Sequence, residues 1–241
     1  MKRRIMSVDL EPDFRSSYAI SLVKVVPKLL DFFDSHNIRA TFFTVSSLLE
    51  RHEDLIREIS RKHEIASHSH THNFLNEVNS SWEIRHSKKK FEEYGFKCEG
   101  FRAPGFVVTP NHLKIVKMAG YKYDSSMAKF YPGRYNNLRM SSKVHEKDGL
   151  KVLPVPNMVY PLVDSGLTYL KAFHPVSKVF AKPYMFYLHP WEFLEKKDLV
   201  KAKSVSGSLL QRNCGAKAVK IFREYVEKSN CKWTTCRDYI R

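Results

Sequence analysis

The sequence predicts an α/β fold, a barrel of seven or eight β/α units. Short apolar runs alternate with longer stretches in which apolar residues recur at helical spacing, and this rhythm indicates parallel strands joined by helical crossovers. The number of repeats favours a barrel over an open sheet. The 241 residues suit one such barrel, and we find no linker, internal repeat or low-complexity tract. We therefore expect a single domain over residues 1–241.

The strands of this barrel are expected where apolar and β-branched residues cluster in short runs. The first run is RRIMSVDL, and the series as a whole occupies residues 3–10, 40–46, 63–69, 100–106, 121–126, 151–157, 184–190 and 231–236. In the fourth run, GFRAPGF, a Pro-Gly pair indicates that the strand passes directly into a turn.

Helices are expected between these strands. Residues 18–36 carry apolar side chains at helical spacing, which predicts one amphipathic helix. Similar patterns predict helices at 48–62, 80–94, 110–119 and 207–229, and the helix at 110–119 starts with a proline, a favoured first residue. Residues 127–182 break the rhythm and are rich in Pro, Gly and Tyr. We expect them to form loops and insertions over one mouth of the barrel.

Charge and composition restrict the partners of the protein. Forty-one Lys and Arg against 25 Asp and Glu give a net charge of +16, which favours anionic partners such as phospholipid head groups or phosphorylated substrates. We find no nucleic-acid-binding motif, so nucleic acid is not expected as a partner. No apolar run of about 18 residues and no signal peptide are evident. We expect a cytoplasmic protein with reduced cysteines, or one held peripherally at the inner face of an anionic membrane.

Polar residues collect where the predicted strands end. Reactive groups of β/α barrels lie at the carboxyl ends of the strands, so polar residues at those points are candidates for the functional site. Six residues meet this condition: Asp9, Glu11, His68, Arg102, Asp124 and His189.

A dense histidine cluster follows the third strand in the stretch EIASHSHTHNF. On an extended strand His68, His70 and His72 would share one face, whereas on a helical turn only His68 and His72 would. Catalytic zinc takes two or three protein ligands of this type plus an open position, so either spacing is acceptable. A third ligand is expected from the acidic run DLEPD after the first strand.

Six motifs in order resemble those of the polysaccharide deacetylase family, also called the NodB-homology or carbohydrate esterase 4 family. They are SVDLEPDF, ATFFTVS, HEIASHSHTH, GFRAPGF, GYKYDSS and FYLHPWEF, and they extend over nearly the whole chain. The resemblance implies a TIM-like distorted barrel. It also implies a divalent metal held by one acidic residue and both ends of an H-x-x-x-H motif, here His68 and His72 with His70 outside.

The resemblance implies roles for the remaining candidates. Two adjacent aspartates are the commonest acidic motif, whereas this chain has Asp9-Leu10-Glu11; we assign Asp9 as general base and Glu11 as metal ligand, with Asp13 in reserve. His189 corresponds to the general acid and Arg102 to the arginine that orients the base. The N–H of Gly105 corresponds to an oxyanion donor. Two roles are open for Asp124: to orient His189 or Arg102, or to form a turn. The aromatic residues expected to line a sugar cleft are Phe106, Trp191 and Tyr160.

The expected function is therefore metal-dependent hydrolysis of an N-acyl group, most simply acetyl, from an amino sugar. Zn²⁺ is the expected ion, with Co²⁺, Ni²⁺ and Mn²⁺ as alternatives. A nucleotide-linked or lipid-linked saccharide would suit the basic surface. The acidic-Trp pair that many relatives carry after the fifth strand is missing here. An alternative function is therefore an inactive barrel that binds glycan or an anionic lipid-linked saccharide.

Overall fold

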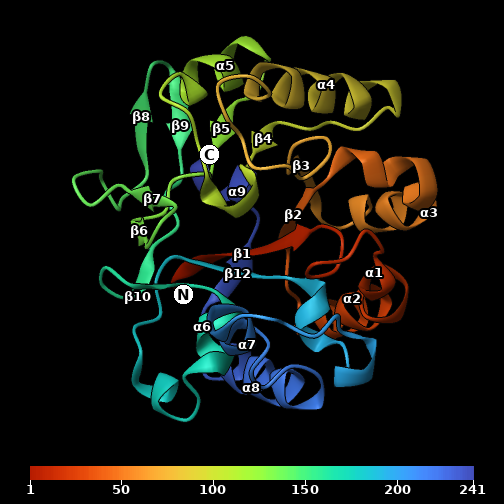
Figure 1. The fold of residues 1–241 in the computed structure, drawn as a ribbon, viewed down its shortest axis with the longest axis vertical. Helices are drawn as coiled ribbons and strands as arrows, with labels where there is room; N and C mark the ends of the chain where they lie inside the picture. The colour runs from red at the N-terminus through yellow and green to blue at the C-terminus, as the bar shows by residue number, and fades with distance from the viewer.

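The computed structural model describes residues 1–241 and shows a curled, mostly parallel sheet partly surrounded by helices (Figure 1). The nine-stranded sheet runs in the order β12-β1-β2-β3-β4-β5-β9-β8, and β13 pairs with the first residues of β1. All pairs are parallel except β8 with β9. The strands are β1 (Arg3–Leu10), β2 (Ala40–Thr44), β3 (Glu64–Ser67), β4 (Gly100–Phe101), β5 (Tyr123–Asp124), β8 (His145–Lys147), β9 (Leu150–Val152), β12 (Met185–Leu188) and β13 (Lys232–Thr234).

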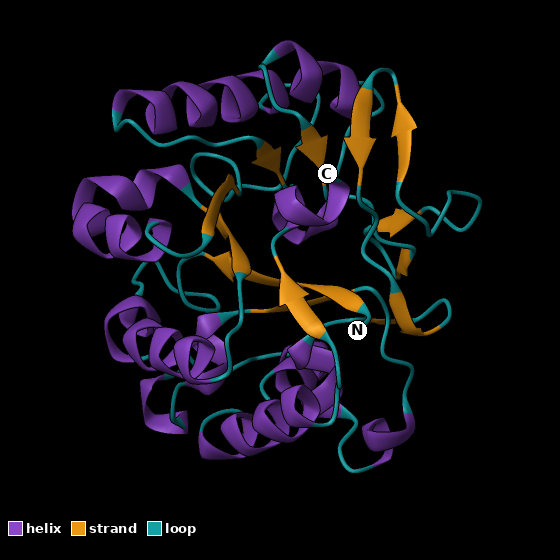
Figure 2. Cartoon of the chain, turned by 180° about the vertical axis from the view of Figure 1, so that it is seen from behind, coloured by secondary structure: helices purple, strands orange, loops and turns teal.

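Helices cover the outer face of the sheet on three sides, and short strands occupy the fourth (Figures 1 and 2). The helices are α1 (Ile20–Lys24), α2 (Val26–Ser35), α3 (Leu49–Ser60), α4 (Ser80–Glu93), α5 (His112–Met118), α6 (Leu167–Ala172), α7 (Val205–Leu210), α8 (Ala216–Glu227) and α9 (Cys236–Ile240). The last of them, α9, bonds to Thr41 and Glu64 near the amino ends of β2 and β3. It therefore covers the end of the barrel opposite to the carboxyl ends of those strands.

The alternation of side chains on β1 decides what faces the inside of the barrel. Met6, Val8 and Leu10 are fully buried in the main core between the sheet and the helices. Successive strand residues point to opposite faces, so Ser7 and Asp9 point inward. A smaller apolar cluster that includes Ile5 and Phe43 fills the rest of the interior. The interior thus combines a small apolar core with a few polar side chains at its carboxyl end.

Two predicted helices are each divided in the structure. The segment 18–36 forms α1 and α2 with a break at Val25, two residues before Pro27. Proline lacks the N–H that would continue the helix, which accounts for the break. The segment 207–229 forms α7 and α8, separated by a loop in which Gly215 has φ +71°. Gly215 directly precedes α8, and glycine adopts a positive φ without strain.

The insertion expected at residues 127–182 contains more regular structure than its composition indicates. It forms two small antiparallel ribbons, β6 (Phe130–Tyr131) with β7 (Tyr135–Asn136) and β10 (Asn157–Val159) with β11 (Val163–Asp164), in addition to β8, β9 and α6. The β8–β9 hairpin turns at Asp148-Gly149, both with positive φ, as a tight hairpin turn requires. None of the helices is long and apolar enough to cross a membrane.

Candidate active site

A cleft lies at the carboxyl ends of the central strands and brings together five of the six polar residues found at strand ends in the sequence. Asp9, Glu11, His68 and His189 line it, and Arg102 lies buried beneath Asp9. The remaining lining residues are Phe14, His72, Phe74, Gly105, Phe106, Tyr131, Arg134, Tyr135, Asp164, Thr168, Tyr169, Tyr187, Trp191 and Leu210. The sixth strand-end residue, Asp124, is not part of the cleft.

Glu11, His68 and His72 form a group of donors suited to a metal ion. One donor atom from each lies within 4.8 Å of the other two. His72 Nε2 is 2.6 Å and His68 Nε2 is 3.4 Å from Oε2 of Glu11. His72 Nε2 is buried, yet its geometry gives no hydrogen bond. One carboxylate and two imidazoles with an unsatisfied, inward-facing nitrogen fit a divalent ion of the zinc class.

The backbone after β3 explains why His68 and His72 meet while His70 does not. Ser69 and His72 both have left-handed φ values, +65° and +68°, so the chain turns sharply instead of extending the strand. His70 therefore points away: its Nδ1 bonds to Ser46 Oγ at 2.9 Å, and its ring packs against Trp82 and His86. Of the two spacings that the sequence left open, the structure selects the i, i+4 pair.

Outer partners hold this loop and its ligands in place. The Nδ1 atom of His68 lies 2.8 Å from the carbonyl oxygen of Arg102, which directs Nε2 toward Glu11. The carboxylate of Glu83 on α4 accepts hydrogen bonds from the backbone N–H groups of His70 and Thr71, both at 2.9 Å. Glu83 was not among the residues identified from the sequence, and helical spacing gave no signal for it.

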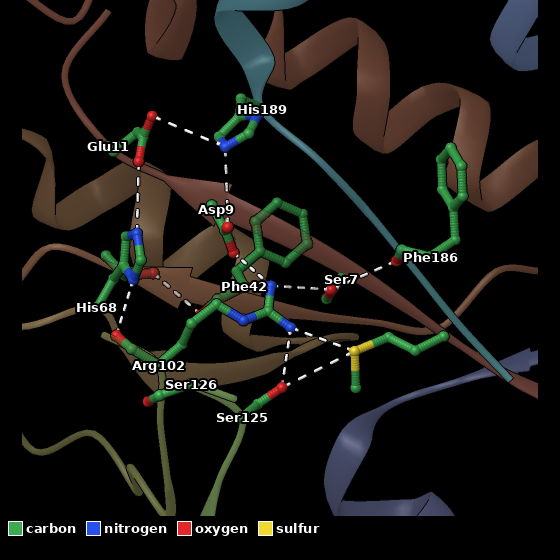
Figure 3. A network of polar contacts seen from close by, with 12 residues as sticks. Ser7, Asp9, Glu11, Phe42, His68, Arg102, Ser125, Ser126, Phe186 and His189 are labelled. Atoms are coloured by element: carbon green, nitrogen blue, oxygen red, sulfur yellow. Dashed lines mark hydrogen bonds and ion pairs between the residues drawn. The ribbon is translucent and has the colours of Figure 1, made fainter. Parts of the chain in front are cut away.

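Asp9 and Arg102 form a buried ion pair beside the metal ligands (Figure 3). Arg102 Nη1 donates to Asp9 Oδ1 at 2.6 Å and to Ser7 Oγ at 3.1 Å, and Nη2 donates to Ser125 Oγ at 3.1 Å. The guanidinium also lies 3.9 Å from the centre of the Phe43 ring. Such a guanidinium fixes one oxygen of Asp9 and leaves the other, Oδ2, directed toward His189.

His189 completes the polar cluster from the end of β12. Its Nε2 is 3.8 Å from Asp9 Oδ2 and 3.9 Å from Glu11 Oε1, and its Nδ1 is 3.4 Å from Glu192 Oε2 (Figure 3 shows the Asp9 and Glu11 contacts). Burial would lower the pKa of His189, but the charge of Glu11 and the hydrogen bond and charge of Glu192 outweigh it and raise the pKa to about 9.

Burial and neighbouring charges also shift the pKa values of Glu11 and His72. Burial would raise the pKa of Glu11, but the charges of His72 and His189 and the close approach of the His68 and His72 imidazoles hold this pKa well below its ordinary value. Burial would lower the pKa of His72, and the adjacent Glu11 raises it instead. The ligand group therefore holds an ionised carboxylate, the form that binds a cation.

Of the four residues expected to contact substrate, Gly105, Phe106 and Trp191 line the cleft. Gly105 has φ +57°, and a Cβ there would lie 2.6 Å from the Phe74 ring, so only glycine fits. Its N–H makes no hydrogen bond within the chain. Phe106 packs edge-on against Tyr187. Trp191 is only 3% exposed; it stacks on His189 and donates its indole N–H to Glu11 Oε1 at 3.3 Å. Trp191 thus supports the ligand group rather than presenting a free face to a sugar.

Three sequence expectations are wrong. Asp124 does not orient His189 or Arg102: it takes the turn-forming role, accepting the Ser126 N–H at 2.9 Å, and it also pairs with His112 Nε2 at 2.8 Å, because α5 places His112 behind β5. Asp13 is not a reserve ligand, because its carboxylate accepts the backbone N–H groups of Ile20 and Ser21 at the start of α1. Tyr160 is 64% exposed and lies outside the cleft.

The sequence analysis missed Glu192, the partner of His189. This carboxylate is fully buried, accepts the His189 backbone N–H at 2.9 Å and a hydrogen bond from Thr168, and lies 3.6 Å from Lys171 Nζ. Burial would raise its pKa, but His189 and Lys171 lower it below the ordinary value. The signal was present: Glu192 follows His189 by three residues in LHPWE, the spacing of a capping box, which the structure shows there.

Comparisons with known proteins find relatives in sequence and in fold. A family profile described as polysaccharide deacetylase matches residues 13–123. Two peptidoglycan-N-acetylglucosamine deacetylases of Bacillus cereus are 33% identical, one over 102 residues and one over 89. These matches cover 40% and 36% of this chain and only 47% and 32% of the two relatives, which is less than half of either protein.

Similarity of the whole fold extends further than similarity of sequence. A Mycobacterium smegmatis protein, assigned provisionally as a polysaccharide deacetylase, superimposes with a TM-score of 0.59 at 19% identity. That match covers 98% of this chain and 89% of the other, so the curled (β/α) barrel is common to both from end to end. The matched profile over residues 13–123, the order of the motifs and this shared barrel show that the chain resembles the polysaccharide deacetylase family.

Proposed function

We propose that this protein is a metal-dependent hydrolase that removes an N-acyl group, most simply acetyl, from an amino sugar. One observation supports this above the others: the Glu11, His68 and His72 donors lie within 4.8 Å of one another in a cleft that also holds the Asp9–Arg102 pair and His189. Amide hydrolysis needs an activated water, a base and an acid, and the cleft offers residues for each of these roles.

Glu11, His68 and His72 are the proposed ligands. A divalent ion held there would act as a Lewis acid on the acyl carbonyl and lower the pKa of water. We propose Zn²⁺ as the resident ion; Co²⁺, Ni²⁺ and Mn²⁺ suit the same donors, and selection among them follows availability. Trp191 and the Arg102 carbonyl restrain Glu11 and His68 respectively, so the ligand atoms are preorganised.

Asp9 is the proposed general base. Arg102 occupies its Oδ1 at 2.6 Å and supplies the opposite charge, while Oδ2 remains free on the cleft side to take a proton from water. The N–H of Gly105, which has no partner in the chain, is the proposed donor to the oxyanion that develops on the acyl oxygen.

His189 is the proposed general acid for the departing amine. Glu192 raises the pKa of His189 through a hydrogen bond and its charge, which favours the protonated imidazole, and it holds Nδ1 so that Nε2 faces the cleft. Oδ2 of Asp9 and Nε2 of His189 are 3.8 Å apart, so both side chains can reach the same amide group of a substrate in the cleft. The base and the acid are thus distinguished by their partners, Arg102 for one and Glu192 for the other.

The proposed substrate is an N-acylated amino sugar within a glycan or a glycan precursor. The net charge of +16 supports a nucleotide-linked or lipid-linked precursor, and it would also favour peripheral contact with an anionic membrane. A barrel that binds glycan without turnover is the alternative. The completeness of the polar set, with base, ligands, acid and their supporting partners in one place, favours catalysis.

The test is elemental analysis of the wild type and Glu11→Ala, paired with an acetate-release assay on N-acetylated saccharides and sugar nucleotides. We expect about one metal ion per wild-type chain, loss of the ion from the variant, and acetate released only by the wild type. Bound metal without acetate release from any substrate would favour the binding function. Absence of metal after reloading would overturn the proposed mechanism.

A further inference from the structure

We propose that Arg134 binds an anionic group of the substrate, a carboxylate or phosphate separate from the N-acyl group that is hydrolysed. Arg134 lies in the turn between β6 and β7, within the insertion that interrupts the barrel rhythm. It is the only arginine or lysine that lines the cleft. The inference rests on the proposed function in one respect, that the cleft receives an N-acylated saccharide.

The guanidinium of Arg134 is held between two aromatic rings. Its central carbon lies 4.9 Å from the centre of the Phe74 ring and 4.7 Å from that of Tyr131. Nη1 lies 3.3 Å from the position that a Cβ on Gly105 would occupy, so the group reaches the wall that carries the proposed oxyanion donor. Aromatic rings attract a guanidinium through its faces and leave the N–H donors at its edge available.

No group of the protein satisfies those donors. The side chain of Arg134 makes no hydrogen bond, and no carboxylate lies within 4.0 Å of it. The acids of the cleft are engaged elsewhere: Asp9 with Arg102, Glu11 with the histidines, and Asp164 with Asn157 at 2.8 Å. A positioned guanidinium without an internal acceptor matches a planar or tetrahedral oxyanion, which it can bind through two parallel hydrogen bonds.

The location determines the kind of substrate. The centre of the cleft is acidic through Asp9 and Glu11, so an anion there would be repelled until a metal ion is bound. Arg134 offers a separate position for negative charge on the Phe74 and Tyr131 wall. We therefore infer that the preferred N-acyl saccharide carries a carboxylate, as on an acidic sugar, or a phosphate, as on a sugar phosphate or a pyrophosphate-linked sugar.

The experiment compares three proteins and three probes. Wild type, Arg134→Gln and the control Arg139→Gln are assayed with a neutral N-acetylglucosamine oligomer, a carboxylate-bearing muramic acid oligosaccharide and a UDP-linked N-acetyl sugar. Arg139 is exposed in the same insertion, forms no ion pair and lies outside the cleft, so its replacement removes the same charge. Both acyl release and equilibrium binding by calorimetry are measured, the latter in the Asp9→Asn background.

We expect Arg134→Gln to lower kcat/KM and affinity for at least one anionic probe by about tenfold or more, with little effect on the neutral oligomer and none in Arg139→Gln. The anionic probe whose binding and hydrolysis fall in Arg134→Gln shows whether Arg134 binds a carboxylate or a phosphate. Equal losses on neutral and anionic probes, or wild-type binding that shows no preference for either anion, would overturn the inference. Arg134-dependent binding without acyl release from any probe would support the inference and count against the proposed function.

Discussion

The indole N–H of Trp191 donates to Oε1 of Glu11 at 3.3 Å, so a residue that follows β12 restrains a carboxylate that follows β1. The same indole stacks on His189 with ring centres 5.4 Å apart. Trp191 therefore links the proposed metal ligand to the proposed general acid. Outer partners of this kind commonly change metal affinity by one to two orders of magnitude.

Trp191→Phe is expected to keep the stacking on His189 and lose the hydrogen bond to Glu11. We predict weaker Zn²⁺ binding by roughly 10–100-fold, because Glu11 loses one restraint on its orientation. Competition with a chromophoric chelator measures this affinity. The matched control is Trp82→Phe, since Trp82 is half exposed and packs on His70 outside the ligand group. Equal zinc affinity in wild type and Trp191→Phe would show that the bond has no role in metal binding.

Alanine variants of the three histidines are expected to differ in the amount of metal they bind. His68→Ala and His72→Ala should each remove one of three ligands and abolish stoichiometric metal. His70→Ala should retain about one ion per chain, because His70 faces Ser46, Trp82 and His86 instead. Elemental analysis after gel filtration distinguishes them. Loss of metal in all three variants alike would mean that the ligand pair is assigned wrongly.

Asp9→Asn is expected to retain metal and lose turnover by about 10²–10⁴-fold, because the amide cannot accept the proton. It should also reduce the free energy of unfolding by about 1–3 kcal/mol, since Arg102 is fully buried and would lose its counter-charge. Elemental analysis, acyl release and urea unfolding measure the three effects. Release of the metal by this variant would indicate that Asp9 is itself a ligand.

Glu192→Gln is expected to lower the pKa of His189, because the variant lacks one of the charges that raise it. A general acid acts in its protonated form, so the alkaline limb of the kcat/KM profile should move to lower pH by about one unit. The control is Glu195→Gln, an exposed acid in the following loop. An unchanged alkaline limb would mean that His189 is not the acid that this limb reports.

His63 is expected to make the fold sensitive to mild acid. It is buried between Phe33 and Phe42, and burial lowers its pKa to about 4. The unfolded chain therefore binds this proton more strongly, and the His63 contribution to stability, complete above pH 6.5, is lost as the pH falls toward 4. Between pH 7 and 5 the loss should be about 1–2 kcal/mol.

Urea unfolding at both pH values, in wild type and His63→Gln, measures the contribution of His63. Glutamine keeps an acceptor for the Ala40 N–H, which lies 3.3 Å from His63 Nδ1, and cannot be protonated in this range. The variant should lose less stability on acidification than the wild type does. An identical loss in both proteins would assign the acid sensitivity to other groups.

The sequence by itself determined the features that depend on local patterning. Alternating apolar runs located β1, β2, β3 and β12 and most helices, because burial on one face imposes a period that can be read along the chain. Local signals also located the proposed metal donors, since the acidic run after β1 and the histidine cluster after β3 lie within short segments; the family resemblance then selected Glu11, His68 and His72 among them.

Only the tertiary structure decided which distant side chains became partners. Asp124 sits at a strand end as predicted, yet it pairs with His112, because α5 packs behind β5 and places this histidine nearer to Asp124 than the cleft residues are. His189 pairs with Glu192, and Trp191 reaches Glu11 across 180 residues of sequence. Arg134 is the only arginine or lysine that lines the cleft, and its side chain has no hydrogen-bond acceptor within the protein. Such pairings depend on how helices and strands pack against one another. The periodic pattern of apolar residues shows which face of an element is buried, but it does not show which other element lies next to that face.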